Sequence, residues 1–336
     1  MGLLKSFSLI GITAVSLGLT ACEKNQPSEQ NKTNAPFGTE QKDDVKTISI
    51  GFQKSSLNLL VTREQKLLES QFPGAKIEWR EFPAGPQMLE ALAVGAVDIG
   101  AVGNTPPIFA QSADKDLNYA AYEVYPGSSL GLVLPKTSNI KELSELKGKR
   151  IALQKGSSAH EFLAKVLQKA GLSWQDIQPI WLPPADARAA LDKGSVDAWA
   201  IWDPFLSAVE LNGNVKVLID SQVFPKTYSY YISNPKFTTQ HPQAVNKIIK
   251  SLNEADQWIV TNQTAAVELY GKSTGLAPEV AKQALDRRLK PSPILAINPE
   301  VIQSQQQIAD LFYAEKLIPK KINVQDAVVS AANKQF

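Results

Sequence analysis

Two stretches of this sequence repeat each other at a distance of about one hundred residues. Residues 50–56 read as an apolar strand followed by Gln-Lys and small hydroxyl residues, and residues 151–158 repeat that order. A second pair, 91–101 and 190–200, shares Ala-Leu, a glycine and Val-Asp at the same spacing. The pairs keep one order and are offset by 101 and 99 residues, so chance similarity explains them poorly. The repeat predicts two similar lobes.

Each repeat unit alternates short strands with helical patterns. We expect helices over 57–71 and 159–170, the second of which Gly171 would end. Helices that alternate with short strands favour the α/β class, and duplication of the unit favours two α/β lobes.

The repeated strand ends also predict a kind of ligand. In open α/β sheets ligands bind at the carboxyl ends of strands, so four junctions, two from each lobe, would line one cleft. Two of these junctions open helices, whose first N–H groups are unpaired and carry partial positive charge. Such a site suits an oxyanion held by neutral donors, including the hydroxyls of Ser55, Ser56, Ser157 and Ser158. The alternative is that these serines only cap their helices.

Two tryptophans follow the second repeat unit closely. Trp199 lies in an apolar strand and is expected in the core, whereas Trp202 lies in the following loop beside Asp203. An aromatic wall beside an anion pocket would suit an apolar tail on the ligand.

The first 44 residues predict export and tethering. Lys5 precedes residues 7–21, an uncharged and mostly apolar run of 15 residues that is too short to span a bilayer, so 1–21 reads as a signal peptide. The run ends in Leu-Thr-Ala and Cys22, which resembles the bacterial lipobox; the alternative is an ordinary secreted protein with a chance cysteine. The polar residues 22–44 would form a flexible, lipid-anchored tether.

Composition limits the partners of the rest of the chain. The formal charge of the whole chain is only +2, which does not indicate nucleic-acid binding. No second long apolar run follows the first. We therefore expect a monomer on the extracytoplasmic side, with membrane contact only through the lipid. Cys22 is the only cysteine, which excludes disulfides and a thiol nucleophile from the folded body.

An enzymatic function is the alternative class, and the sequence contains one motif that would indicate it. Residues 127–131 match the G-x-S-x-G nucleophile pattern, but that pattern needs a helix after Ser129, and 130–134 reads as a strand. His160 and His241, the only histidines, lie far apart, and no zinc motif is present, so we expect no metal and no cofactor. A serine hydrolase and a surface protein without a ligand stay as alternatives from other classes.

Several long segments resemble the aliphatic sulfonate-binding proteins of ABC importers. These are residues 82–92, 154–160 and 184–204, with 310–313 and 318–321 near the C-terminus. The resemblance covers about residues 46–325 and is closer to the sulfonate branch than to the wider nitrate, sulfonate and taurine superfamily.

The resemblance implies a type II periplasmic-binding-protein fold, with two α/β lobes joined by two crossover segments. We place the crossovers near 129–135 and 227–234, which gives lobe one as 45–131 plus 232–336 and lobe two as 132–231. It implies that the protein carries an aliphatic sulfonate for sulfur acquisition to an ABC permease with its ATPase subunit. Taurine, a sulfate ester and nitrate are the alternative ligands.

The resemblance also implies a set of ligand-binding residues. Lobe one would supply Gln53, Ser55, Asn104 and Thr105, lobe two Ser157, Ser158 and His160, and the tail would meet Trp202 and Asp203. His160 could instead pack on its own helix. Two loops depart from the family pattern: Ser55 stands where glycine is usual, and Asn104 where aspartate is common. Without that aspartate the site lacks a negative charge that would bind an amine, so taurine-like zwitterions are less expected as ligands.

Overall fold

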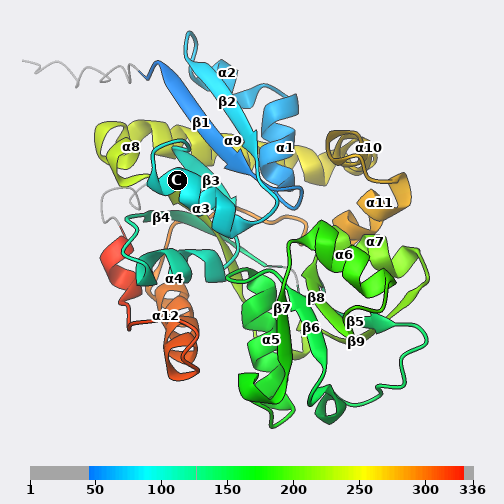
Figure 1. Cartoon of the computed structure of the whole chain (residues 1–336). Coiled ribbons are helices and arrows are strands. Elements are labelled where there is room, and N and C mark those ends of the chain that lie inside the picture. Colours follow the sequence, from blue (N-terminus) through cyan, green and yellow to red (C-terminus); the bar gives the residue numbers. More distant parts are fainter. Residues whose placement is uncertain (1–44, 126, 329–336) are drawn as a thin grey trace, which may run out of the picture. The chain divides into compact units, whose positions relative to one another are not determined.

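The computed structural model describes residues 45–125 and 127–328, in which two five-stranded sheets lie with helices on their faces (Figure 1). The predicted signal peptide, Cys22 and the tether lie outside these residues. The first sheet has the order β2-β1-β3-β10-β4, and its strands are β1 (Thr47–Phe52), β2 (Lys76–Glu81), β3 (Ile99–Val102), β4 (Asn118–Val124) and β10 (Tyr228–Ser233). The second has the order β7-β6-β8-β5-β9, with β5 (Leu130–Pro135), β6 (Arg150–Leu153), β7 (Gln178–Trp181), β8 (Ala198–Trp202) and β9 (Val215–Asp220).

The two sheets share one plan. β1 runs parallel to β2 and β3, and β6 runs parallel to β7 and β8. The fourth strand of each sheet, β10 or β5, is antiparallel to its neighbours. The predicted α/β class and the two similar lobes are therefore confirmed.

Helices cover both faces of each sheet. The first sheet carries α1 (Leu57–Glu64), α2 (Leu67–Gln71), α3 (Gly85–Ala93), α4 (Thr105–Ser112), α8 (Pro235–Gln240), α9 (Pro242–Thr261), α10 (Gln263–Thr274), α11 (Pro278–Arg287) and α12 (Pro299–Ala314). The second carries α5 (Ser158–Lys169), α6 (Pro184–Asp192) and α7 (Phe205–Leu211). The helix expected over 57–71 is two helices, because Lys66 takes a left-handed conformation with φ 52°. No helix in the described part of the chain is long and apolar enough to cross a membrane.

The repeated Val-Asp pair has a structural role in both lobes. The backbone N–H of Ser49 donates to Asp98 Oδ2 at 2.8 Å, and that of Arg150 donates to Asp197 Oδ2 at 2.8 Å. The N–H groups of the two aspartates return bonds of 2.8 Å to the carbonyls of Ser49 and Arg150. Each aspartate therefore ties the segment before β3 or β8 to β1 or β6, and so aligns the strand ends that carry the site.

Two glycines let β1, β3 and α3 approach closely. A Cβ on Gly100 would lie 2.5 Å from the carbonyl oxygen of Gly51 and 2.9 Å from Met88 Sδ. Met88 is fully buried. A side chain at Gly100 would therefore push α3 off the sheet.

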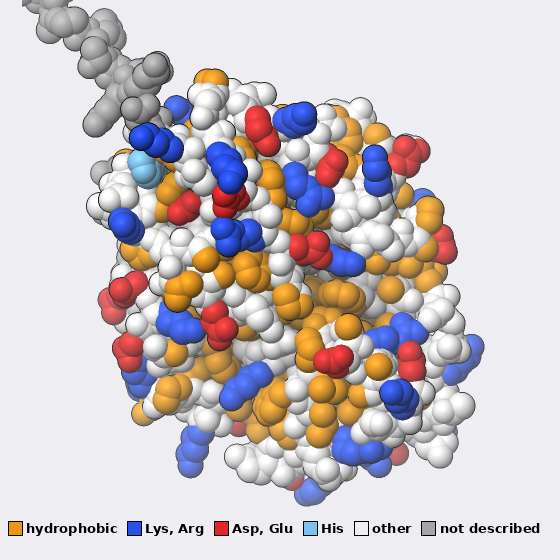
Figure 2. Space-filling view, turned by 45° about the horizontal axis from the view of Figure 1, so that its top comes forward, with side chains coloured by type: hydrophobic (Ala, Val, Ile, Leu, Met, Phe, Trp, Pro, Cys, Tyr) orange, Lys and Arg blue, Asp and Glu red, His pale blue; other side chains and the backbone are white. Residues whose placement is uncertain are grey.

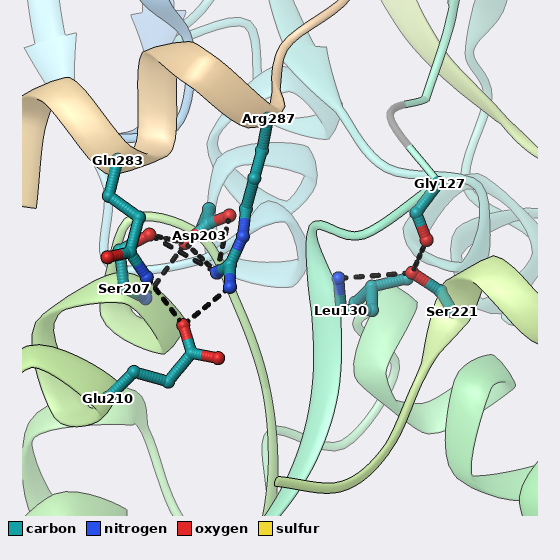
Figure 3. Close-up of polar contacts among 8 residues, drawn as sticks. All are labelled: Gly127, Leu130, Asp203, Ser207, Glu210, Ser221, Gln283 and Arg287. Atoms are coloured by element: carbon teal, nitrogen blue, oxygen red, sulfur yellow. Dashed lines mark hydrogen bonds and ion pairs between the residues drawn. The ribbon is translucent and has the colours of Figure 1, made fainter. Parts of the chain in front are cut away.

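The chain crosses from the first sheet to the second between β4 and β5 and returns between β9 and β10, and these two connections are the crossing segments. The runs that we expected to be crossovers, 129–135 and 227–234, are mostly the strands β5 and β10, because these β-rich runs occupy the fourth place in each sheet. Leu130 and Gly131 thus belong to the second sheet. The two crossing segments are joined by Ser221, whose Oγ donates to the Gly127 carbonyl at 2.5 Å and accepts the Leu130 N–H at 3.2 Å (Figure 3).

Candidate ligand-binding site

A cavity of about 110 Å³ lies where the two sheets face each other. The carboxyl ends of four strands reach it: β1 through Gln53 and Ser55, β3 through Gly103, β6 through Ser157 and Ser158, and β8 through Trp202 and Asp203. This is the place where open α/β sheets bind ligands. Six of the nine residues expected at the ligand line this cavity.

The serines at the two helix starts differ in what their hydroxyls do. Ser56 and Ser157 are the N-cap residues of α1 and α5, yet neither side chain makes a capping hydrogen bond. Ser56 Oγ accepts the Gln53 N–H at 3.2 Å, and Ser157 Oγ donates to the Gln154 carbonyl at 2.8 Å. Because the Ser157 hydroxyl hydrogen is used there, Ser55 and Ser158 are the better candidates to donate to a bound oxyanion.

Gln53 fixes the loop after β1. Its side chain is buried, and its Nε2 donates to the Ala101 carbonyl of β3 at 3.0 Å. The ends of β1 and β3 are thereby held together, so that the loop with Ser55 and the loop with Gly103 face the cavity side by side.

The two lobes touch at the cavity. A Cβ built on Gly103, which follows β3, would lie 1.8 Å from Ser158 Oγ at the start of α5. A side chain at this position would fit only if the Ser158 hydroxyl turned away or the lobes moved apart. The described arrangement is therefore a closed one.

Trp202 and Asp203 line the cavity, although Trp202 is the last residue of β8 and not part of the following loop, and Trp199 lies in the core as expected. Trp202 lines the cavity and meets the edge of Phe205 at 6.0 Å. Asp203 accepts from the backbone N–H and the hydroxyl of Ser207, at 2.9 and 2.6 Å, and lies 3.4 Å from Arg287 Nη1 (Figure 3). Burial raises the pKa of the Asp203 carboxyl, against the effect of these partners.

Asn104 and Thr105 are not brought to the cavity. Asn104 Nδ2 donates to Thr227 Oγ1 at 2.7 Å, and Thr105 Oγ1 donates to Asn104 Oδ1 at 3.0 Å. Gln305 Nε2 donates to the Asn104 carbonyl at 2.5 Å. These contacts hold the start of α4 against the second crossing segment. Asn104 does not line the cavity, so no contact supports the expectation that Asn104 disfavours zwitterions.

His160 also lies away from the cavity. It is two residues after Ser158, which turns its side chain roughly 200° around α5. The ring is fully buried against four aromatic rings at centroid distances of 4.7 to 5.4 Å: Phe109, Trp174, Trp181 and Phe312. Its Nδ1 accepts the Gly156 N–H at 3.2 Å, and burial, with Lys155 nearby, lowers its pKa to about 3.

Sequence reasoning missed a group of cavity residues from β4, β10 and the helices after the second crossing. They are Glu123, Tyr125, Ser229, Tyr270, Leu285, Arg288 and Ser292. Tyr270 to Ser292 lie in a region that has no counterpart in the second lobe, so the repeat could not indicate them. An arginine at the end of a helix is too common a pattern to single out from sequence.

The alternative enzyme motif has the wrong geometry for catalysis. Ser129 is followed directly by β5, so the strand-to-helix turn of a nucleophile elbow does not form. Among the described residues, no group of three or more His, Cys, Asp or Glu side chains could hold a metal ion. On the face that Figure 2 draws, Lys and Arg are interspersed with Asp and Glu.

Comparison with known proteins places the chain in a family. The model of the family described as NMT1/THI5 like matches residues 75–266, more than half of the chain. A putative aliphatic sulfonates-binding protein of Escherichia coli (strain K12) is 41% identical over 292 residues, which are 87% of this chain and 91% of that protein. A taurine-binding periplasmic protein of the same organism is 29% identical over 64% of this chain and 67% of its own length.

A solved structure has the same fold at similar identity. The alkanesulfonate-binding protein SsuA from Xanthomonas axonopodis pv. citri, bound to MOPS, matches with a TM-score of 0.82 and 42% identity, and the match covers 84% of this chain and 98% of that one. The chain therefore belongs to the NMT1/THI5-like family, in the branch of the aliphatic sulfonate-binding proteins.

Proposed function

We propose that this chain is the extracytoplasmic solute-binding component of an ABC importer and that it binds an aliphatic sulfonate between its lobes. The observation that carries this proposal is the pair of repeated strand-to-helix junctions, one from each lobe, that meet at one cavity. The similarity to proteins named for sulfonate binding supports it. The protein acts as a carrier and not as an enzyme.

The sulfonate oxygens bind at the starts of α1 and α5. Ser55 and Ser158 donate from their hydroxyls, and the unpaired N–H groups of the first helical turns donate from the backbone. A sulfonate spreads one charge over three oxygens, so neutral donors from two lobes can share it. The tail lies against Trp202 and Tyr270, which line the same cavity.

Closure around the ligand gives the transport signal. The lobes hinge at the two crossing segments, and the closed form is the one that the permease recognises. The contact between Gly103 and Ser158 forms only when the lobes are closed. Energy for transport comes from the ATPase subunit of the importer.

Tethering is the second part of the proposal. Cys22 follows Leu-Thr-Ala at the end of the apolar run, and it is the only cysteine of the chain. We infer that it carries a diacylglyceryl group and that residues 23–44 let the body stand off the membrane. Cys22→Ser should move the protein from the membrane fraction to the soluble fraction in its native host; unchanged fractionation would contradict the anchor.

A ligand screen tests the binding function. Purified protein from residue 45 onward is melted with methane- to hexanesulfonate, taurine, sulfate, a sulfate ester and nitrate. A ligand at 100 times its Kd adds about 2.7 kcal/mol of stability, which raises Tm by a few degrees in a body of this size. Ser158→Ala should lose most of the shift because it removes a donor, while Ser144→Ala, in the 3₁₀ turn before β6, serves as the control. No shift with any sulfonate would overturn the proposal.

A further inference from the structure

The charged side chains that line the cavity are unequally paired. Glu123, Arg288 and Asp203 line the cavity, and Asp256 lies directly behind Arg288. Asp203 has Ser207 and Arg287 as partners. Whether a carboxylate remains unpaired and able to bind a ligand depends on which groups Arg288 pairs with.

Arg288 is committed to protein groups. Its Nη2 donates to Asp256 Oδ1 at 2.7 Å and to Asn58 Oδ1 at 2.8 Å, and its Nη1 donates to the Leu289 carbonyl at 3.0 Å. Asp256 also accepts the Ser292 N–H at 3.1 Å through both of its oxygens. The Arg288–Asp256 pair is thus neutral and largely satisfied, and it leaves little capacity for Glu123.

Glu123 has weaker partners. Its Oε2 lies 3.5 Å from Asn58 Nδ2 and 3.4 Å from Ser292 Oγ, at the outer limit of hydrogen bonding. Within residues 45–125 and 127–328, no ion pair of 4.0 Å or less includes Glu123. Burial raises the pKa of its carboxyl, and Arg288 opposes that shift from a distance. Glu123 is therefore a carboxyl group in the cavity whose hydrogen bonding a ligand could complete.

The surroundings of Glu123 suit a cation close to the sulfonate. Tyr125, Tyr270 and Trp202 line the same cavity, and aromatic faces attract ammonium groups. Asn58, which reaches Glu123, lies in the first turn of α1, and Ser55 lies in the loop just before that helix, so the carboxyl group and the proposed sulfonate donors line one cavity.

We propose that Glu123 determines specificity at the tail end of the ligand by accepting a hydrogen bond from a protonated amine. The preferred ligands are then zwitterionic sulfonates, which carry a protonated amine on the tail. This inference rests on the proposed function, because it needs the sulfonate at the starts of α1 and α5. It also reverses the preference that Asn104 suggested from sequence, since the negative charge comes from β4 instead.

A matched ligand pair tests the proposal. Calorimetric titrations compare 3-aminopropane-1-sulfonate with butane-1-sulfonate, which has a methyl group in place of the ammonium. The wild type should bind the amine at least about tenfold more tightly, because a desolvated ion pair between ligand and protein exceeds 1.4 kcal/mol. Glu123→Gln should lose that advantage and keep the affinity for butanesulfonate within about threefold. Glu90→Gln, on the surface of α3, is the matched control and should change neither value.

A pH series keeps the test valid if Glu123→Gln folds poorly. Other titratable or charged groups near Glu123 are Arg288, Asp256, Tyr125 and Tyr231, with Asp203 across the cavity. The amine stays protonated as the pH falls, whereas a carboxyl group whose pKa is raised by burial takes up its proton at a higher pH than a free carboxyl group. The preference for the amine should therefore decrease as the pH falls in the wild type, and stay flat in Glu123→Gln.

The outcomes separate the two proposals. If neither sulfonate binds, the proposed function fails. If butanesulfonate binds as tightly as the amine, or if Glu123→Gln weakens both ligands equally, only the role of Glu123 fails. A pH series in which the preference stays constant would also overturn it.

Discussion

His160 shows how a residue beside the ligand loop can belong to the core. Its ring lies between Phe109 and Phe312 of the first lobe and Trp174 and Trp181 of the second. Its Nε2 is buried without a hydrogen-bond partner, and burial lowers its pKa to about 3. This histidine is therefore neutral in the folded protein at any physiological pH.

That low pKa predicts loss of stability in mild acid. The unfolded chain titrates His160 near its ordinary value of 6.5, so between pH 6.5 and 3 the unfolded state binds the extra proton. Lowering the pH to 5 should then cost the wild type about 2 kcal/mol through this residue. Urea unfolding of wild type and His160→Asn at pH 7.5 and 5.0 measures it: the variant should lose about 2 kcal/mol less. Equal losses would contradict the prediction.

At this scale the sequence predicts which loops meet and not which side chains face the ligand. The repeat indicated Ser55, Ser56, Ser157 and Ser158 because strand ends converge by topology, and all four line the cavity. Asn104, Thr105 and His160 lie in the same loops but turn away, because helix rotation and contacts to α12 set their directions. Those contacts join residues more than 150 positions apart, which spacing alone does not reveal.

The elements around the cavity depend on one close approach. Gly103 ends the β3 loop, Ser158 begins α5, and the absent side chain of Gly103 is what lets the lobes meet. Gly103 is not in the left-handed region, so alanine fits its backbone. A larger residue here would act on closure and not on folding.

Gly103→Ala should therefore uncouple binding from stability. Its Cβ would overlap Ser158 Oγ at 1.8 Å, so that either the Ser158 hydroxyl turns away or the lobes stay apart, and both changes should weaken sulfonate binding at least about tenfold. The Tm of the ligand-free protein should stay within about 3 °C, since a surface-like change costs less than about 0.5 kcal/mol. Calorimetry and thermal melts measure the two effects. Unchanged affinity, or a ligand-free Tm lowered by 10 °C, would contradict the closed contact.

Elements were easier to predict than their partners. The runs 129–135 and 227–234 read as extended from composition, yet we expected them to cross between lobes. They form β5, which lies beside β8, and β10, which lies beside β3. Their strand character is local, whereas the sheet that each joins depends on the whole chain.

Across the whole molecule, a second contact joins the lobes beside the cavity. Arg287, at the end of α11, points to Asp203 and to Glu210 of α7, and Gln283 Nε2 donates to Glu210 Oε2 at 2.8 Å (Figure 3). Arg287 Nη2 lies 2.6 Å from Glu210 Oε2. Because Asp203 also lines the cavity, this cluster couples the cavity wall to the interface between α11 and α7.

Removal of Arg287 should shift the protein toward an open form. Arg287→Met keeps most of the side-chain volume but leaves Asp203 and Glu210 without their cation, which should cost the closed form about 1–3 kcal/mol. Ligand affinity should fall about five- to a hundredfold, and the ligand-saturated protein should keep the same scattering radius as the wild type. Lys282→Met, an exposed residue of the same helix, is the control.

A substitution at Glu210 shows whether the cluster holds the lobes together or only shapes the cavity wall, because Glu210 does not line the cavity. If the cluster acts by holding the lobes together, Glu210→Gln should weaken binding in the same direction as Arg287→Met, by a smaller factor. The double variant should then lose less than the product of the two single factors, because both changes break one pair. If Glu210→Gln leaves affinity unchanged while Arg287→Met lowers it, Arg287 acts on the ligand only through Asp203.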